Sequence, residues 1–214
     1  LETAPLPQDV VKLGADGINH LWREKKLRAV GIKRAQPLVE AAQNSIGLDG
    51  GVCARMEMQM LLEDYRVKEV QLEKATAVLE AETLKIPYTE KLLSIKGVGL
   101  ITVAGFLSEV GDIRRFDSPK QIQKLAGLEL KENSSGKHQG RTSISKRGRK
   151  RLRKILFQVM LPMIQNNAEF REVYEYFTTR QKNSLKGKQA IIAAGCKLIR
   201  VFYTILKHGV DYDP

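Results

Sequence analysis

Apolar residues recur at helical spacing along most of the chain, and turns rich in glycine or proline separate the apolar segments. Residues 52–84 contain neither glycine nor proline and consist mainly of strong helix formers, which predicts a single long helix. Strand-like alternation is limited to residues 142–145. The pattern therefore predicts a mainly α fold. Shorter helices are predicted over residues 14–28, 33–45, 89–94, 100–110, 118–126, 149–165 and 188–208.

The long predicted helix has an apolar stripe that is only partly continuous. Five large apolar residues fall on one face: Met58, Leu62, Tyr65, Leu72 and Leu79. Glu69 and Thr76 interrupt the stripe, so the pattern favours an irregular coiled coil over a regular one. Because a domain of this size cannot cover so long a helix, we expect it to pair with another copy of the chain.

Pro87 ends the long helix and marks the predicted domain boundary. The pattern divides the chain into a helical, coiled-coil region over residues 1–86 and an α-helical domain over residues 87–214. The sequence begins at Leu1 and not at a methionine, so we expect it to be a piece of a longer protein or a decayed or internally started copy.

The chain is strongly basic, with 36 lysines and arginines against 24 acidic residues and a formal net charge of +12. Such an excess points to a polyanionic partner, of which nucleic acid is the commonest. No apolar run reaches the roughly 18 residues that a membrane span needs. The N-terminal residues LETAPLPQDV also lack the pattern of a signal peptide. We therefore expect a cytoplasmic protein with no membrane partner.

Nine of the basic residues fall in residues 137–154, a segment without a single acid. They are Lys137, Arg141, Lys146, Arg147, Arg149, Lys150, Arg151, Arg153 and Lys154. The helix predicted in this segment has an apolar stripe of Leu152, Ile155, Leu156 and Val159, so its cations project elsewhere. The alternative is a charged face that is only solvated by water. Repulsion among nine cations without an acid between them favours contact with nucleic-acid phosphates instead.

A second candidate is the run LLSIKGVGLITVAGFL at residues 92–107. Gly97 and Gly99 permit a tight turn between two helices, with unpaired backbone N–H groups at the start of the second helix. This pattern resembles the helix-hairpin-helix motif of DNA-binding proteins, and Lys96, Gly97 and Gly99 are then the predicted DNA contacts. The alternative is an ordinary corner between two helices, in which the glycines only permit close packing.

Ser134 and Ser135 precede Gly136 in the serine- and glycine-rich loop at the start of the basic segment. A serine in a cationic loop can attack a phosphodiester, because nearby cations stabilise the alkoxide and the charged transition state. A turn or cap hydroxyl is the more ordinary role of such a serine. His138 is a candidate base by its position alone.

Side chains that bind metals are sparse. A magnesium-dependent nuclease needs about three or four converging carboxylates, and only Glu109, Asp112 and Asp117 cluster in the sequence. The two aspartates are expected to cap the turn or to pair with Arg114 and Arg115. Outside this group, the sequence predicts two reduced packing thiols and no zinc site, because no second Cys or His accompanies Cys53 or Cys196.

Four sub-motifs in order, KGVGLITVAGFLSEVGDI, RFDSPKQIQKLAGL, ENSSGK and SISKRGRKRLR, resemble the C-terminal domain of a group of bacterial insertion-sequence transposases. The group includes the Piv/MooV-type DNA invertases and the RNA-guided bridge recombinases. Its members pair an N-terminal RuvC-like domain, which has a DEDD acidic site, with a C-terminal domain that bears a serine. The similarity extends upstream through WREKKLRAVGIKRAQPLVEAAQNSIG and the long helix.

The resemblance implies that Ser135, just before Gly136, is the nucleophile that forms a phosphoserine intermediate with DNA; Ser134 is the adjacent alternative. It also implies that Mg²⁺ is held by the acids of the RuvC-like domain, which nothing in this sequence matches. The catalytic centre would then combine both domains across the copies of a dimer or tetramer. In the bridge recombinases, a guide RNA pairs with donor and target DNA.

Two hypotheses follow. The first is the C-terminal part of a serine-nucleophile DNA transposase or recombinase, which alone binds nucleic acid but does not cut it. The second is a non-catalytic helix-hairpin-helix module that recognises nucleic acid and uses its serines as loop caps. A RuvC-like domain upstream in the same reading frame would favour the first.

Overall fold

The computed structural model describes residues 1–47, 51–131, 134–135, 138–139 and 142–213, and it describes only the backbone of residues 134, 135, 138 and 139. The described part is mainly α-helical, which confirms the predicted fold class. The chain divides into two compact units, Leu1–Ala75 and Thr76–Pro214. This division falls within the long helix, whereas the sequence places the boundary just after it.

Unit 1 is built on a pair of packed helices, α1 (Pro7–Glu24) and α2 (Ile32–Gln43). Ile18 and Ala35 are buried between them. Arg55, near the start of the long helix, donates hydrogen bonds of 2.7 and 2.6 Å to the Asp9 carboxylate of α1. These bonds lower the pKa of the Asp9 carboxyl below its usual value.

The predicted bounds of the first two helices are partly wrong. The first helix begins at Pro7 and not at residue 14, because Gly14 is a kink inside it with φ +66°. It ends at Glu24 and not at residue 28, since Lys26 and Ala29 have left-handed backbone conformations. The second helix contains Pro37 and ends at Gln43, two residues earlier than predicted.

The long helix α3 (Gly51–Leu84) confirms the prediction for residues 52–84 to within one residue. Its large apolar side chains are mostly exposed in the described structure, including Tyr65 at 64% and Leu72 at 68%. Cys53 is also exposed, so the expectation of a packing thiol is wrong there. Cys196 is partly buried, and burial raises the pKa of its thiol to about 11.

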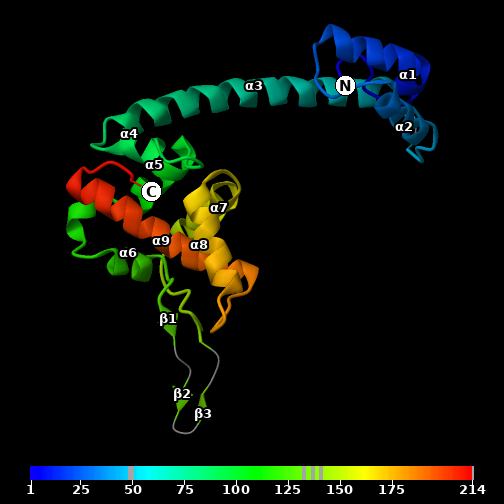
Figure 1. Ribbon diagram of the computed structural model, residues 1–214. Coiled ribbons are helices and arrows are strands. Elements are labelled where there is room, and N and C mark those ends of the chain that lie inside the picture. The colour runs from blue at the N-terminus through cyan, green and yellow to red at the C-terminus, as the bar shows by residue number, and fades with distance from the viewer. Residues whose placement is uncertain (48–50, 132–133, 136–137, 140–141, 214) are drawn as a thin grey trace. The chain divides into compact units, whose positions relative to one another are not determined.

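Unit 2 is organised around α9 (Gly187–His208), which has nine buried residues and contacts most other helices of the unit (Figure 1). α9 is long and apolar enough to cross a membrane, but its apolar residues pack into this core, so its composition is weak evidence for a membrane span. The Phe106 and Phe202 rings meet edge to face in the core, with centroids 5.0 Å apart. Around α9 lie α4 (Thr89–Leu93), α5 (Leu100–Val110), the 3₁₀ turn η1 (Ile113–Arg115), α6 (Pro119–Leu125), α7 (Lys150–Asn166) and α8 (Ala168–Thr179).

Helix α8 lies between the predicted helices 149–165 and 188–208 and is not among the predicted elements. Its start is capped by the Asn167 side chain, which accepts a hydrogen bond from the Phe170 backbone N–H at 3.1 Å. Phe170, Val173 and Phe177 recur at helical spacing and were the available signal. The sequence analysis also missed three of four short strands, which pair as β1 (Leu130–Lys131) with β4 (Ser143–Ile144) and as β2 (Ser134–Ser135) with β3 (His138–Gln139).

Candidate nucleic-acid interface

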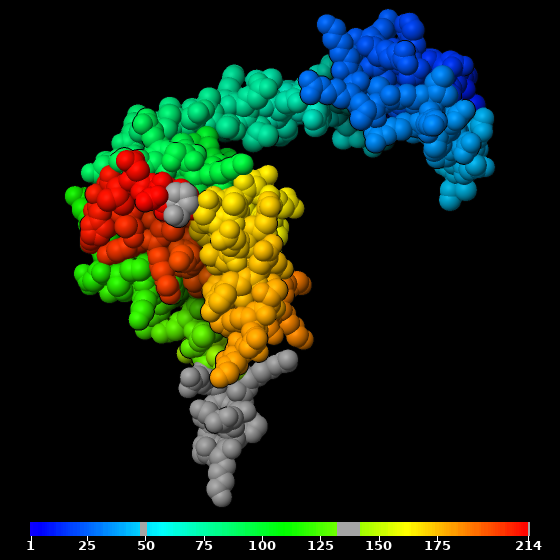
Figure 2. All heavy atoms as spheres, viewed as in Figure 1, coloured from blue at the N-terminus to red at the C-terminus, as the bar shows by residue number. Residues whose placement is uncertain are grey.

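Helix α7 separates an apolar face from a basic one, as its sequence predicts. Leu152, Leu156 and Val159 are buried in the core of unit 2, and Ile155 is half-buried against Gly105 of α5. Arg149, directly before the helix, is exposed. Figure 2 shows α7 in yellow on the face of unit 2 turned to the viewer. The exposed cations within the helix are Lys150, Arg151 and Lys154.

One acid from another part of the chain lies beside the basic helix. The Glu109 side chain of α5 is only 14% exposed, and its carboxylate oxygens lie 3.6 Å from Arg149 Nη1 and 3.8 Å from Arg151 Nε. Both distances exceed those of a strong charge-assisted hydrogen bond. Glu109 therefore orients the guanidinium groups of Arg149 and Arg151. One carboxylate beside two guanidinium groups leaves a net positive charge at the start of α7.

Arg153 differs from its basic neighbours because it is half-buried and bonded to the backbone. Its Nη1 donates to the Ala126 carbonyl at 2.8 Å and to the Lys146 carbonyl at 3.4 Å. These bonds fasten the segment before β1 to the segment after β4. The guanidinium of Arg153 thus has a structural role, and its predicted contact with nucleic acid remains a prediction.

The paired strands β1 and β4 begin an arm, and we call the junction at its base the arm root (residues 125–130 and 143–153). Two glycines complete this junction. Gly127 has φ +69° and Gly148 has φ +137°. A Cβ at Gly148 would lie 2.3 Å from the Leu125 carbonyl oxygen, and a Cβ at Gly127 would lie 2.6 Å from the Arg147 oxygen. Backbone atoms occupy both places, so no side chain fits at either position.

Backbone hydrogen bonds close the arm root. The N–H groups of Ser145, Lys146 and Arg149 donate to the carbonyls of Glu129, Gly127 and Leu125 at 2.7, 2.9 and 2.7 Å. The arm root therefore holds the strands β1 and β4 at the base of the arm. It also holds Arg149, the first residue of the basic surface, which consists of Arg149, Lys150, Arg151 and Lys154.

The arm continues from β1 and β4 to the β2–β3 pair. Ser134 pairs with Gln139, and Ser135 pairs with His138. The structure therefore brings Ser135 and His138 to opposite positions of one backbone ladder. Lys137 and Arg141, which the sequence predicts as DNA contacts, lie outside the described residues, as does Gly136.

The predicted corner at residues 92–107 consists of α4, a turn and α5. Lys96 and Gly99 are exposed, and Gly99 is the N-cap of α5. Gly97 has φ +94°, and a Cβ there would lie 3.0 Å from the backbone of Met163 in α7. Gly97 therefore serves close packing, which agrees with the alternative interpretation, whereas Lys96 and Gly99 are open to a ligand. DNA contact by this corner remains a prediction.

A buried asparagine ties the corner to the end of α7. Asn167 is 2% exposed, and its Nδ2 donates to the Lys96 carbonyl at 3.3 Å. The same side chain caps α8, as described above. The sequence does not point to Asn167, whose partner Lys96 is 71 positions away, and it places Glu109 in an acidic cluster and not beside the arginines of α7.

The acidic residues near the corner are already engaged. Asp112 accepts from the Arg114 guanidinium and from its backbone N–H at 2.9 Å, and these bonds lower the pKa of the Asp112 carboxyl. Of the two expected roles, capping the turn or pairing with an arginine, Asp112 has both, whereas the Asp117 carboxylate accepts a hydrogen bond from the Gln121 side chain at 3.3 Å. Within the residues that the structure describes, no three His, Cys, Asp or Glu side chains come together to hold a metal.

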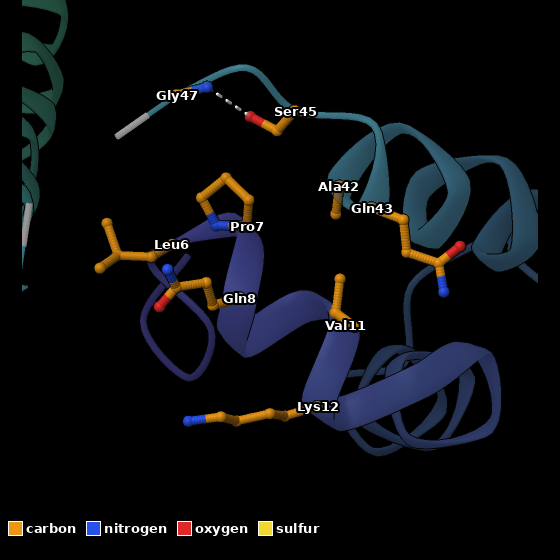
Figure 3. A pocket seen from close by; sticks show the side chains of 9 residues that line it. All are labelled: Leu6, Pro7, Gln8, Val11, Lys12, Ala42, Gln43, Ser45 and Gly47. Carbon is orange, nitrogen blue, oxygen red and sulfur yellow. Dashed lines mark hydrogen bonds between the residues drawn. The ribbon is translucent and has the colours of Figure 1, made fainter. Parts of the chain in front are cut away.

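Two cavities in the described structure are candidates for a small-molecule site. A hollow of about 470 Å³ in unit 1 lies between the start of α1 and the end of α2, where Val11 and Ala42 face it and Lys12 is the only charged residue in the described part of its lining (Figure 3). A second cavity of about 360 Å³ lies beside α7, floored by apolar residues, with Lys150 and Lys154 in its lining. Neither of these two cavities has a nucleophile with an adjacent base in its described lining.

Parts of this chain are similar to known transposases and to a gene-inverting protein. Residues 89–175 match the family model described as the transposase IS116/IS110/IS902 family. The chain is 25% identical to the insertion element IS900 uncharacterized 42 kDa protein of Mycobacterium paratuberculosis, over 97% of this chain and 52% of that protein. It is 29% identical to the pilin gene-inverting protein of Moraxella lacunata, over 61% of this chain and 41% of that protein.

A third relative is the transposase for insertion sequence element IS1111A of Coxiella burnetii, 31% identical over 40% of this chain and 24% of that protein. The chain spans about half the length of the relatives that match nearly all of it. The matched segment begins at α4 and includes the corner, the arm root, the arm and the basic helix. Residues 89–175 of this chain are therefore similar to the transposase domain of the IS116/IS110/IS902 family, over less than half of the chain.

Proposed function

We propose that this chain is the DNA-binding and serine-bearing part of a DNA recombinase that cuts and rejoins strands through a phosphoserine intermediate. The observation that carries the proposal is the arm root, because one junction holds both the arm with Ser135 and the start of the basic helix. A phosphate backbone bound along α7 would then lie at the root of the arm that contains Ser135. This goes beyond the family match, which supports a transposase domain without assigning its residues.

The proposed chemistry is a transesterification. The Ser135 hydroxyl gives up its proton as its Oγ forms a bond to phosphorus. The bond from phosphorus to one sugar oxygen breaks, and that oxygen takes up a proton and leaves as a hydroxyl. Attack by a sugar hydroxyl of another strand on the phosphoserine reverses these steps and rejoins DNA. The exchange conserves the number of phosphoester bonds, so it needs no external source of energy.

Magnesium does not fit the described residues of this chain, because Asp112 and Asp117 are bonded to their own neighbours and Glu109 lies between two arginines. We therefore assign Mg²⁺ to a RuvC-like domain outside the sequence. A guide RNA, as in the bridge recombinases, and a cytoplasmic location are part of the same proposal.

The proposal is tested with a version of the protein that includes a RuvC-like domain. We expect denaturing gels of reactions with nicked and intact duplex DNA to show a covalent protein–DNA adduct. Peptide mapping should place this adduct on a serine of the arm. Tight binding without any adduct would instead favour the second candidate, a non-catalytic binding module.

DNA binding by the chain itself is expected to depend strongly on salt. If several of the cations in 137–154 contact phosphates, affinity should fall about 10³-fold between 50 and 200 mM salt. Fluorescence anisotropy with duplexes of unrelated sequence measures this fall. Replacing Arg149, Lys150, Arg151 and Arg153 by alanine should reduce both the affinity and its salt dependence. Binding that is indifferent to salt or to these changes would contradict the prediction.

Self-association through α3 is also expected. The helix has 34 residues, and most of its large apolar side chains are exposed in the described structure of one chain. Light scattering at rising protein concentration should show a dimer or tetramer. Replacing Tyr65, Leu72 and Leu79 by lysine should shift the mass toward the monomer, whereas a strict monomer of the unaltered chain at high concentration would refute the pairing.

A further inference from the structure

Unit 1 has a concentrated group of cations that the family match does not cover. We call it the turn patch, defined by six basic residues at the end of α1, the start of α2 and the turn between them. Each of them is exposed, and Glu24 is the only acid in the same stretch of sequence. The members of the turn patch are Arg23, Lys25, Lys26, Arg28, Lys33 and Arg34.

The turn patch concentrates positive charge within unit 1, which has no net charge. Residues 1–75 contain eleven lysines and arginines and eleven aspartates and glutamates, so the whole excess of +12 belongs to residues 76–214. Ten of the eleven acids of unit 1 lie outside residues 23–34. A generally basic composition therefore does not explain the patch. Concentrating six cations in twelve residues costs repulsion that an even distribution would avoid.

Nearby acids do not neutralise the patch. The Glu24 carboxylate lies 3.9 Å from His20, and Glu2 is bonded to Arg66, although Lys25 also contributes to lowering the pKa of Glu2. Within the described residues, no Asp or Glu oxygen comes within 4 Å of a charged nitrogen of the six cations. The patch thus keeps most of its charge available for an outside anion.

The backbone of the turn is held in a defined shape. The N–H groups of Lys26 and Leu27 donate to the carbonyls of Arg23 and Trp22, each at 3.0 Å. The turn borders a shallow hollow of about 470 Å³, and Arg23, Lys33 and Arg34 are its charged lining residues. Three cations around a concave surface match the shape and charge of a phosphate-bearing backbone.

We propose that the turn patch binds the phosphate backbone of duplex DNA as a second contact surface, additional to the basic surface of α7. This inference rests on the proposed function, because that function makes DNA the polyanion that the protein must hold. The contact does not depend on the DNA sequence. Lysine ammonium and arginine guanidinium groups bind phosphates, and the patch has no fixed set of amides that would read bases. RNA is the competing occupant, and the experiment separates the two.

The single tryptophan of the chain provides the probe. Trp22 adjoins Arg23, so a ligand bound at the patch should change its fluorescence, and no other tryptophan contributes. The 214-residue chain is titrated with a mixed-sequence duplex DNA, and affinity is measured in parallel by anisotropy over a series of salt concentrations. The turn variant combines Lys25→Gln, Lys26→Gln and Arg28→Gln. Its matched control combines Lys12→Gln, Lys68→Gln and Lys74→Gln, which removes equal charge from unit 1 outside the patch.

We expect the turn variant to lose about tenfold in affinity, with the salt slope falling by about 0.9 for each lost phosphate contact, and to lose the Trp22 response. The control should stay within about twofold, and circular dichroism should show equal helix content in all variants. A turn variant that matches its control, or a Trp22 signal that duplex DNA leaves unchanged, would overturn the inference. A Trp22 response to an RNA hairpin at concentrations where duplex DNA gives none would also overturn it.

A third variant distinguishes failure of this inference from failure of the proposed function. Lys150→Gln, Arg151→Gln and Lys154→Gln should weaken overall binding but leave the Trp22 response at saturating DNA. If these changes abolish binding while the turn variant has no effect, the inference fails and the proposed function stands. If the unaltered chain does not bind DNA at all, both fail.

Discussion

Replacing Ser135 by alanine is expected to abolish DNA strand cleavage in a protein that includes the RuvC-like domain, while DNA affinity stays nearly unchanged. Cleavage requires an oxygen nucleophile at the phosphorus, and alanine has none. Affinity comes mainly from lysine and arginine contacts with phosphates, to which one hydroxyl adds little. Denaturing gels measure the cleaved strand and the covalent adduct, and anisotropy measures binding with the same DNA.

Ser134→Ala is the matched control for this change, because it removes the same hydroxyl from the neighbouring residue of β2. It should leave cleavage intact. Loss of cleavage in Ser134→Ala, with normal cleavage in Ser135→Ala, would move the nucleophile by one residue. If Ser135 only caps a loop, its alanine variant should cut normally and lose about 1 kcal/mol of stability. Residues 1–214 alone should not cut DNA, and cleavage by this chain would refute a centre that needs both domains.

Most helices of unit 2 could be predicted from the sequence because they combine strong periodicity with a definite start or stop. The segment 100–110 begins after Gly99 and ends before Gly111, and the predicted and observed bounds of this helix coincide. The bounds in unit 1 were less predictable. There, Gly14 kinks a helix that continues on both sides, and two non-glycine residues adopt left-handed conformations that no sequence rule requires.

The basic surface of α7 was predictable from local sequence, but the contacts that shape it were not. The stripe of Leu152, Leu156 and Val159 fixes which side of α7 is buried, and that leaves the cations outside. The carboxylate of Glu109 reaches this surface only because α5 packs on α7. Likewise, the local sequence does not show that Gly148 lies where two backbone segments approach closely, because the second segment, at Leu125 and Gly127, is more than twenty residues away.

The corner at Gly97 and Gly99 shows how one short motif combines two roles. The pattern alone does not separate a phosphate-binding turn from a packed corner, because both need small residues at the same positions. In the structure, Gly97 lies against Met163 while Gly99 is open. Packing therefore explains one glycine, and the other remains available for the predicted contact with DNA.

Gly148→Ala is expected to be the most destabilising single methyl addition at a described glycine of unit 2. The new Cβ would lie 2.3 Å from the Leu125 carbonyl oxygen and 2.8 Å from the Gly127 nitrogen, both backbone atoms that no rotamer change can move. The φ of +137° adds strain for any residue with a Cβ. We expect a loss of roughly 3 kcal/mol or more in the free energy of unfolding. Urea denaturation followed by circular dichroism measures this loss.

Gly99→Ala is the control for this change, because its Cβ meets no atom within 4 Å and its φ of −111° suits any residue. It should change stability by less than about 1 kcal/mol. Because the arm root also holds the first basic residues of α7, Gly148→Ala should weaken DNA binding at temperatures where the protein is still helical, whereas a variant that merely lowered stability would bind normally there. Unchanged stability and unchanged DNA affinity in Gly148→Ala would show that the arm root does not have the close-packed geometry that holds the arm with Ser135.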